Sequence, residues 1–403
     1  MNLDHLVLHP VAGFYLGACS AQIKKNGKTD LVVAELCKEA ITAATFTQNA
    51  FCAAPVTLAK FNLAEVQPRA LIINAGNANA GTGEQGMIDA KQSCDWVANE
   101  LGCNSNQVLP FSTGVIGENL PMEKFQLGIP QAIANLAVTS WKDACLGIMT
   151  TDLVPKTVSK IIEIDGHSVT ITGMSKGSGM IHPNMATMLG FVATDAKINQ
   201  PCLQKCLTDA VNISFNRITV DGDTSTNDAC TLTATQQADM PEINSVDSEA
   251  YQQFAEEINS VMTELAQMIV RDGEGATKFV SVIVEGGNSQ QECLKVAHTV
   301  ALSPLVKTAL FASDPNWGRI LAAVGRSEIS ALDVDKIKIY LGDVCIVENG
   351  GRASDYTEEA GQAVMNETDI DILIQLNRGD YAETVWTTDF SYDYVKINAE
   401  YRS

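Results

Sequence analysis

The residues that most suggest chemistry are a threonine and the small residues before it. Segment 176–190 reads Lys-Gly-Ser-Gly-Met-Ile-His-Pro-Asn-Met-Ala-Thr-Met-Leu-Gly, and Thr187 enters an apolar stretch. If the peptide bond between Ala186 and Thr187 is cut, Thr187 gains a free α-amine that acts as the base for its own hydroxyl nucleophile. An α-amine has a pKa of about 7.7–8.0, close to the pH at which a general base works best. A β-branched threonine also suits the start of a buried strand, so both interpretations stay open.

A second candidate is the short segment 112–117, which reads Ser-Thr-Gly-Val-Ile-Gly and follows a strand-like stretch at 108–111. A turn of small residues after a strand can direct backbone N–H groups outward, which is the geometry that an oxyanion hole uses. Such segments are more often ordinary turns, so the pattern by itself leaves the role of 112–117 open.

A third pattern, Gly-Thr-Gly-Glu-Gln-Gly at 81–86, matches the glycine fingerprint of dinucleotide-binding proteins. In that fingerprint the glycines directly follow a strand, and an acidic residue lies about 20 positions further on. Here residues 76–80 intervene after the strand, and no acidic residue ends a second strand near position 106. We therefore predict a tight turn that opens a helix.

Neither the cysteines nor the acidic residues form a recognisable metal site. The 11 cysteines include no CxxC pair. The spacing of Cys202 and Cys206 predicts that they share one helix face, and no histidine is near them. Zinc sites need closer clusters of nitrogen and sulfur ligands, so we expect buried free thiols in a reducing compartment. In a calcium-binding loop that began at Asp221, position 12 would be a glutamate, but here it is Leu232, so we interpret segment 221–228 as a structural turn near the site.

The composition is that of a globular protein with more than one domain. The chain has 403 residues, of which 46% are apolar and 19% charged, and its formal net charge is −21. At about 150 residues per domain, this length predicts two or three domains. The negative charge disfavours nucleic acid and anionic membrane surfaces as partners. No basic residue precedes Lys24, and no apolar stretch reaches the roughly 18 residues of a membrane span, so we expect a cytoplasmic protein.

Apolar stretches bounded by turn residues predict alternating strands and helices. The predicted strands are 11–21, 31–36, 70–75, 108–111, 161–164, 169–171, 188–194, 278–284, 337–341, 370–376 and 384–388. The predicted helices are 87–101, 203–211 and 249–270. This order favours the α/β or α+β class, and periodicity alone does not choose between them.

The candidate segments agree, in order and spacing, with one enzyme family. Segment 176–190 resembles the self-cleavage motif of the ornithine acetyltransferases, the bifunctional glutamate N-acetyltransferases of arginine biosynthesis. Further segments resemble the same family and extend the match over nearly the whole chain: 74–80, 112–117, 149–152, 220–228, 273–279, 313–319 and 394–403.

The resemblance implies a fold and a maturation step. The fold would be a four-layer αββα sandwich, similar to N-terminal-nucleophile hydrolases but with different connectivity, together with a smaller C-terminal α/β part. Residues 1–186 would become the α chain and residues 187–403 the β chain, with both chains sharing one core. The family commonly assembles as an α2β2 heterotetramer.

The resemblance also implies the roles of individual residues. Thr187 would be the nucleophile, and the Thr113 hydroxyl and Gly114 N–H would form the oxyanion hole. The substrate pocket around Thr187 would be lined by Thr150, Lys176, Glu274, Asn398 and Ser403. In such a pocket a lysine can pair with the substrate carboxylate and a glutamate with a cation. The family pattern does not depend on a histidine at position 182, so His182 is given no role.

The implied reaction is acetyl transfer from N2-acetyl-L-ornithine to L-glutamate through an acetyl-Thr187 intermediate, with ping-pong kinetics. It needs no metal and no bound cofactor, and acetyl-CoA stays open as a second acetyl donor. Two alternatives remain. One is an amidase or aminopeptidase of the L-aminopeptidase/D-Ala-esterase type, which uses the same threonine. The other is a non-catalytic binding protein that never cleaves itself.

Overall fold

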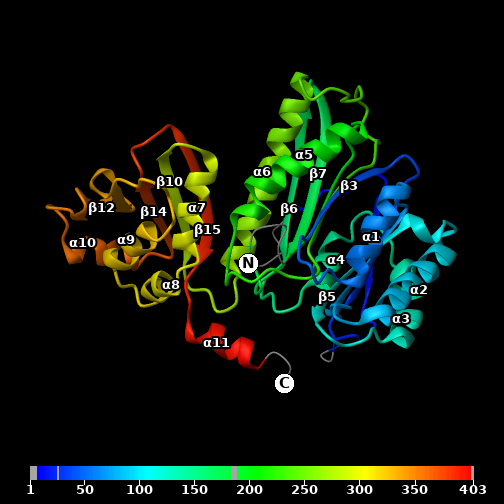
Figure 1. The fold of residues 1–403 in the computed structure, drawn as a ribbon. Helices are drawn as coiled ribbons and strands as arrows, with labels where there is room; N and C mark the ends of the chain where they lie inside the picture. Colours follow the sequence, from blue (N-terminus) through cyan, green and yellow to red (C-terminus); the bar gives the residue numbers. More distant parts are fainter. Residues whose placement is uncertain (1–6, 25–26, 183–187, 401–403) are drawn as a thin grey trace. The chain divides into compact units, whose positions relative to one another are not determined.

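The computed structural model describes residues 7–24, 27–182 and 188–400, and the chain divides into two compact units. The first unit comprises Met1–Met180, Asn184–Asn216 and Asp223–Ile269, and the second comprises Ile181–Pro183, Arg217–Gly222 and Val270–Ser403. Each unit has its own sheets and its own hydrophobic core (Figure 1). Two folded bodies fall within the range that the length predicts.

The first unit contains two sheets. The four-stranded sheet has the order β1-β2-β4-β5, with strands Phe14–Cys19, Leu31–Leu36, Ala70–Asn77 and Val108–Val115. The five-stranded sheet has the order β3-β9-β8-β7-β6, with strands Ile41–Phe46, Ala229–Ala234, Leu189–Thr194, His167–Lys176 and Lys156–Ile164. Strands β4 and β5 are parallel, as are β8 and β9, and the other neighbours are antiparallel.

Strand β2 shows why these apolar stretches become central strands. Side chains of a strand alternate between the two faces of its sheet, so a strand covered on both faces is apolar throughout. Val32 and Ala34 pack into the core between the two sheets, whereas Leu31 and Val33 pack into the core beneath the helices. The continuous apolar stretch therefore serves two cores at once.

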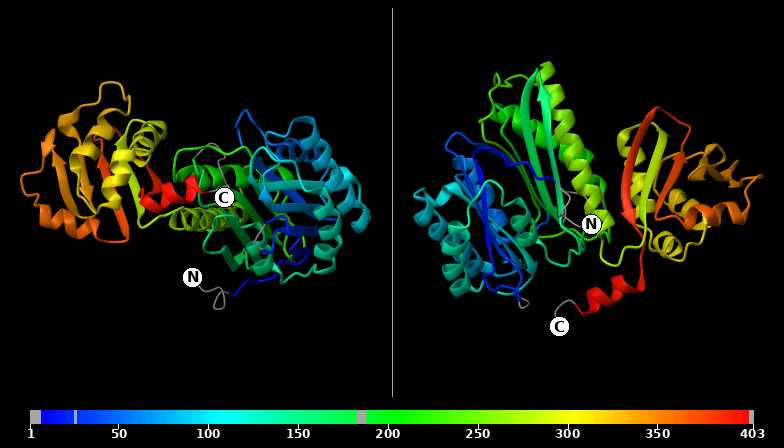
Figure 2. Two further views of the ribbon diagram at one scale, coloured as in Figure 1. Left: turned by 90° about the horizontal axis from the view of Figure 1, so that it is seen from below. Right: turned by 180° about the vertical axis from the view of Figure 1, so that it is seen from behind.

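Helices cover the outer faces of both sheets. Helices α1 (Ala54–Glu65), α2 (Gly83–Leu101) and α3 (Met122–Ala134) lie on the four-stranded sheet, and α5 (Gln200–Ile213) and α6 (Glu249–Arg271) lie on the five-stranded one (Figure 1). In the view from behind, α6 runs along the five-stranded sheet (Figure 2). Between the sheets, the rings of Phe111 and Phe191 meet edge to face at 5.1 Å. This arrangement confirms the predicted four-layer sandwich.

Helix α4 (Trp141–Ile148) contributes buried side chains to the core between the two sheets of the first unit. The Trp141 ring stacks on Phe14 of β1 at 5.3 Å, and its neighbours Ala144, Cys145 and Ile148 belong to the same core. A helix inserted at this point positions the loop that follows it, which carries Thr150.

The predicted cleavage junction falls between strands of one sheet. In the five-stranded sheet, β3, β6 and β7 precede position 187, whereas β8 and β9 follow it. Strand β8 is hydrogen-bonded to β7 on one side and to β9 on the other. Segments from both sides of the junction therefore share one sheet and one core.

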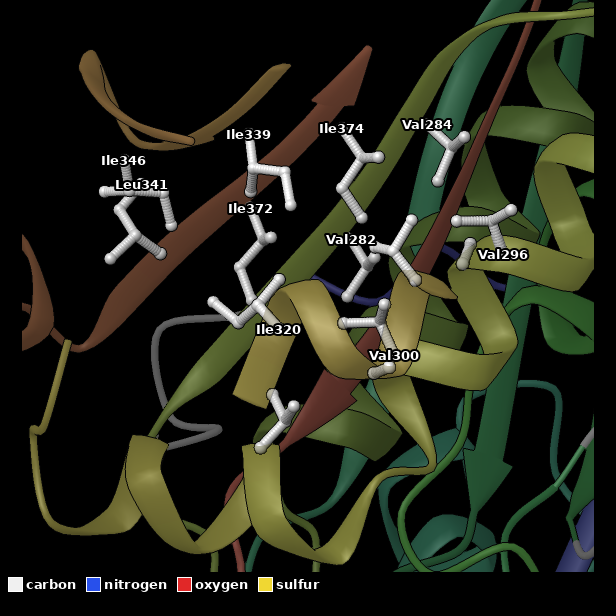
Figure 3. Packing of buried hydrophobic residues seen from close by; sticks show 14 of the residues in the cluster. Val282, Val284, Val296, Val300, Ile320, Ile339, Leu341, Ile346, Ile372 and Ile374 are labelled. Atoms are coloured by element: carbon white, nitrogen blue, oxygen red, sulfur yellow. The ribbon is translucent and has the colours of Figure 1, made fainter. Parts of the chain in front are cut away.

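The second unit is a six-stranded sheet with the order β13-β12-β11-β14-β10-β15. Its strands are Gly351–Arg352, Val344–Glu348, Lys338–Leu341, Asp369–Gln375, Phe279–Gly287 and Tyr381–Thr388. Its helices are α7 (Gln290–Ala301), α8 (Pro304–Phe311), α9 (Trp317–Gly325), α10 (Glu358–Met365) and α11 (Tyr392–Ala399). Branched side chains of β10, β14, α7 and α9 pack together in its core (Figure 3). This unit is the predicted smaller C-terminal α/β part.

The described part of the chain also contains three short 3-10 helices: Ser105–Gln107, Phe215–Arg217 and Val334–Lys336. The predicted elements have their expected types, and several boundaries move. The helix predicted at 87–101 begins at Gly83, within the glycine pattern of 81–86, as a helix-opening turn should.

One prediction about 112–117 needs correction. The segment is not a turn after a strand, because β5 continues to Val115 and includes both Thr113 and Gly114. Gly114 has φ +135° and pairs with Gly76 of β4. A Cβ at Gly114 would lie 2.3 Å from the carbonyl carbon of Gly76. Two glycine backbones thus approach where side chains would not fit, and this close approach extends the strand pair.

The thiols agree in part with expectation. All 11 cysteines are free, and six of them are buried, whereas Cys19, Cys37, Cys52, Cys103 and Cys345 are partly exposed. The prediction that all are buried is therefore wrong for five. Across 7–24, 27–182 and 188–400, no helix is long and apolar enough to cross a membrane.

Candidate active site

Three strand ends meet at one edge of the five-stranded sheet. The register places Lys176, the last residue of β7, opposite Leu189, and Leu189 opposite Ala229. The Ala229 N–H donates to the Met188 carbonyl oxygen at 3.2 Å. The chain that follows the predicted junction therefore enters the sheet between Lys176 and the start of β9.

The end of β5 brings two predicted residues to the same neighbourhood. The Lys176 ammonium donates to the Thr113 hydroxyl oxygen at 3.3 Å, so a side chain of one sheet contacts a side chain of the other. Both side chains are buried, with 6% of Lys176 and 9% of Thr113 exposed. The structure thus joins one predicted oxyanion-hole residue to one predicted substrate-binding residue.

Asp152 supplies the negative charge of this neighbourhood. Its carboxylate accepts hydrogen bonds from the Lys156 ammonium at 2.7 Å, the Gly177 N–H at 2.8 Å and the Thr150 N–H at 2.9 Å. Burial alone would raise the pKa of Asp152, but Lys156 and Lys176 outweigh burial and hold that pKa well below its ordinary range. The carboxylate therefore stays ionised and fixes the backbone beside two predicted site residues, Thr150 and Lys176.

Asp152 is a buried carboxylate beside the predicted site residues that the sequence does not single out. It stands in the segment 149–152 that carries the family resemblance, but only Thr150 was assigned a role there. The available signal was weak: a lysine, Lys156, follows Asp152 by four positions. Such a spacing normally marks a solvated pair on a helix, whereas here both side chains are almost completely buried.

The second unit brings together two other predicted residues. The Asn398 side-chain amide of α11 donates to the Glu274 carboxylate at 2.8 Å. Glu274 is buried, with 6% exposed. Next to it, Gly275 has φ +69°, and a Cβ there would lie 2.5 Å from the Tyr394 nitrogen. The loop that carries Glu274 therefore fits closely against the first turn of α11.

Lys307, on α8, is a buried charge that the sequence reasoning did not single out. Its ammonium donates to the Thr387 hydroxyl at 2.9 Å and to the Thr388 carbonyl, and it lies 4.6 Å from the centre of the Phe390 ring. Burial lowers the pKa of Lys307 from 10.5 to about 7, although Asp389 and Asp221 oppose this shift. Hydrogen bonds from Lys307 thus connect α8 to the end of β15, just before the segment that leads to α11.

Asp221 does more than shape the turn that we predicted. Its carboxylate accepts the Ile181 N–H at 2.9 Å and the Tyr394 hydroxyl at 3.3 Å. In the second unit it therefore connects α11 to Ile181, six residues before the predicted nucleophile.

The predicted set is therefore divided between the units. The first unit holds Thr113, Gly114, Thr150 and Lys176, and the second holds Glu274 and Asn398. Thr187, Ala186 and Ser403 lie outside the described residues. A single pocket lined by all of them stays a prediction. Among the described residues, no group of three or more histidine, cysteine or acidic side chains is placed to hold a metal ion.

Comparison with known proteins gives consistent matches. A family model described as the ArgJ family matches residues 15–403. The "Arginine biosynthesis bifunctional protein ArgJ" of Pseudomonas syringae pv. tomato is 56% identical over 396 residues, which are 98% of each chain. The protein of the same name from Pseudomonas fluorescens is 55% identical with the same coverage. A crystal structure of arginine biosynthesis bifunctional protein argJ from Bacillus halodurans is similar with a TM-score of 0.51 and 39% identity, covering 53% of this chain and 100% of that one.

Proposed function

The chain belongs to the ArgJ family and is an acetyltransferase of arginine biosynthesis, and we propose that it moves the acetyl group of N2-acetyl-L-ornithine to L-glutamate through Thr187. The observation that carries this proposal is the match to residues 15–403, which includes the junction between Ala186 and Thr187. Self-cleavage at this junction supplies the free α-amine that the mechanism requires.

The reaction proceeds in two balanced halves. The Thr187 hydroxyl attacks the acetyl carbonyl carbon while the α-amine of Thr187 accepts the hydroxyl proton. The C–N bond to ornithine then breaks, and the proton passes to the departing ornithine nitrogen. The α-amine of glutamate then attacks the acetyl ester and gives a proton to the α-amine of Thr187. The ester C–O bond breaks, this proton passes to the Thr187 oxygen and restores the hydroxyl, and N-acetylglutamate leaves. Each half passes through an oxyanion that needs hydrogen-bond donors.

The first unit supplies groups suited to that oxyanion and to an anionic substrate. In our proposal the Thr113 hydroxyl and Gly114 N–H donate to the oxyanion. Lys176 contacts the Thr113 hydroxyl and pairs with the substrate carboxylate. The Asp152 carboxylate offsets part of the positive charge of Lys156 and Lys176, and it accepts the Thr150 N–H. In the second unit, Glu274 is the proposed partner of the ornithine ammonium and Asn398 a polar contact, while Ser403 completes the predicted binding residues.

We infer that residues 1–186 and 187–403 stay together after the cut, because strands from both sides of the junction share the five-stranded sheet. Assembly of two such pairs into an α2β2 heterotetramer in the cytoplasm remains part of the proposal. The cycle needs no bound cofactor, and acetyl-CoA serves as a second acetyl donor for glutamate.

Initial-rate kinetics test the proposal. With N2-acetyl-L-ornithine and L-glutamate varied together, a ping-pong cycle gives parallel double-reciprocal lines and no ornithine release beyond one turnover when glutamate is absent. Sustained ornithine release without glutamate would identify a hydrolase of the amidase or aminopeptidase type. A protein that stays uncut and releases no ornithine would be the non-catalytic alternative.

A further inference from the structure

One buried amide in the first unit contacts the C-terminal parts of two neighbouring strands of the four-stranded sheet. Asn227 lies just before β9 and has 6% of its surface exposed. Its side-chain NH₂ donates to the Ser112 carbonyl at 2.9 Å and to the Ala78 carbonyl at 2.6 Å. Ser112 is on β5, and Ala78 directly follows β4. One side chain that lies just before a strand of the five-stranded sheet therefore contacts both parallel strands of the four-stranded sheet, three residues before the end of β5 and one residue after the end of β4.

The bond to Ser112 acts on the peptide unit that directly precedes the proposed oxyanion donors. The Ser112 carbonyl and the Thr113 N–H belong to one planar peptide unit, so fixing the carbonyl also fixes the orientation of that N–H. Gly114 follows with φ +135°, a conformation without a side chain to hold it by packing. The direction of the Gly114 N–H therefore depends on the peptide units before and after it. The bond from Asn227 holds the preceding unit, which joins Ser112 to Thr113.

The Asn227 side chain is itself held in this orientation. Its Oδ1 atom accepts the Thr226 hydroxyl at 2.6 Å, and its backbone N–H donates to the Ser225 hydroxyl at 3.1 Å. The Ser225 carbonyl in turn accepts the Thr47 hydroxyl at 2.8 Å. With its carbonyl oxygen bonded to Thr226, the amide directs both of its hydrogens toward β4 and β5.

The same segment also fixes the chain that follows the nucleophile. Two residues after Asn227, the Ala229 N–H bonds to the Met188 carbonyl. The stretch 227–229 therefore contacts the peptide before Thr113 on one side and the residue after Thr187 on the other. These are the two backbones whose mutual placement decides whether an oxyanion formed at Thr187 meets its donors.

We propose that Asn227 is a positioning residue that aligns the Thr113–Gly114 oxyanion donors with the start of β8. The inference rests on the proposed function. Asn227 touches no substrate in this account. It lowers the barrier of steps that pass through an oxyanion, which are self-cleavage and both halves of acetyl transfer, and it leaves substrate affinity unchanged.

The chain offers a matched control in Asn62. This buried asparagine, 3% exposed, donates through its side-chain amide to the Val108 carbonyl at 2.9 Å, at the other end of the same strand β5. Asn62→Ala and Asn227→Ala therefore each remove a buried amide bond to β5. Only the second bond lies beside the donors.

The experiment compares wild type, Asn62→Ala, Asn227→Ala and Asn227→Asp. Denatured intact mass gives the rate of self-cleavage, and kcat and KM are normalised to the cleaved fraction. We expect Asn227→Ala to slow self-cleavage and to lower kcat by about 10²-fold, near what loss of one oxyanion-hole donor costs, with KM within twofold of wild type. Asn62→Ala should also lower the Tm, by less than Asn227→Ala because it loses one amide hydrogen bond in place of two, and should keep wild-type rates.

Asn227→Asp adds a readout that a purely structural role would not give. An ionised aspartate cannot donate to the two carbonyls, whereas a protonated one donates a single hydrogen bond. The kcat of this variant, relative to wild type, should therefore recover as the pH falls toward 5.

Several outcomes would overturn the inference while leaving the proposed function intact: wild-type rates in Asn227→Ala, a rise in KM in place of a fall in kcat, or equal losses in Asn62→Ala. Failure of both Asn227 variants to fold while Asn62→Ala folds would also overturn it, because Asn227 would then determine the fold. If wild type itself neither cleaves nor transfers acetyl groups, the proposed function fails, and the inference falls with it.

Discussion

In the first unit, Thr113 and Lys176 lie near the ends of hydrogen-bonded strands beside buried charges, whereas in the second unit Asn398 lies on α11, a helix with no buried residue. Lys176 contacts a residue of the opposite sheet, and its neighbour Asp152 accepts three hydrogen bonds. Asn398 contacts Glu274 through one side-chain bond. The first arrangement is held by the core itself, and the second by the close fit of α11 against the loop at Gly275.

This difference has a physical consequence. A group embedded in the core cannot move without cost to folding, which suits donors that must be in place before charge develops. A group on an exposed helix can be altered with little effect on the fold, which suits a contact that serves substrate binding. Changes in the first unit should therefore affect stability and chemistry together, whereas changes on α11 should affect binding alone.

The largest effect is expected for Asp152→Asn. The substitution leaves the buried Lys156 and its neighbour Lys176 without their carboxylate, and breaking a buried pair costs about 3–5 kcal/mol in the free energy of unfolding. Urea denaturation at pH 7 measures this loss. The control is Asp209→Asn, which removes the exposed pair with Lys205 at the same N–O distance of 2.7 Å and should leave the Tm unchanged. Equal effects at both sites would contradict the contrast between buried and exposed charges.

The second-largest loss in the free energy of unfolding is expected for Gly114→Ala. Its Cβ would lie 2.3 Å from Gly76 while the backbone keeps φ +135°, so strain and overpacking together should cost about 2–4 kcal/mol and disturb self-cleavage. Gly102→Ala is the matched control, because that glycine has φ +66° at the end of α2 with no atom within 4 Å of an added Cβ. Its cost should be limited to about 1 kcal/mol of backbone strain. Thermal denaturation of each variant gives its Tm. A smaller fall in Tm for Gly114→Ala than for Gly102→Ala would contradict the close approach of Gly114 to Gly76.

A dependence of stability on pH is expected from Lys307 in the second unit. Burial lowers the pKa of Lys307 to about 7, so between that pH and 10.5 the unfolded chain binds a proton that the folded chain does not. Stability therefore rises with pH across this window, by up to about 1.4 kcal/mol per pH unit from this one group. Lys307→Met removes the group, so its urea-denaturation free energies at pH 7, 8.5 and 10 should rise less steeply than those of wild type. If the free energy of unfolding rose equally steeply with pH in wild type and in Lys307→Met, the lowered pKa of Lys307 would be contradicted.

The smallest effect is expected for Asn398→Ala. It deletes one hydrogen bond to a carboxylate, worth about 1.5 kcal/mol, so KM should rise by at most about tenfold while kcat, self-cleavage and the Tm keep their wild-type values. Lys396→Ala, on the same helix, is exposed and serves as the control for changes in α11 itself. A fall in self-cleavage in Asn398→Ala would show that the two units are not as different as we describe.

Local patterns predicted the elements well, because an apolar stretch such as 31–36 depends only on residues that are neighbours in the sequence. The extension of β5 through Gly114 escaped prediction, since it depends on Gly76, a glycine on another strand. The same limit applies to Asn227, whose partner Ser112 is 115 residues away. No periodicity marks a residue whose role depends on so distant a contact.

The acetylation state of Thr187 tests the central claim most directly. The protein is incubated with N2-acetyl-L-ornithine in the absence of glutamate and then denatured, and the masses of its undigested polypeptides are measured by mass spectrometry. We predict that the 43.2 kDa chain appears as two fragments, that the fragment beginning at Thr187 carries one acetyl group, and that added glutamate removes it. An uncut chain, or a cut chain that gains no acetyl group on Thr187, would contradict the account.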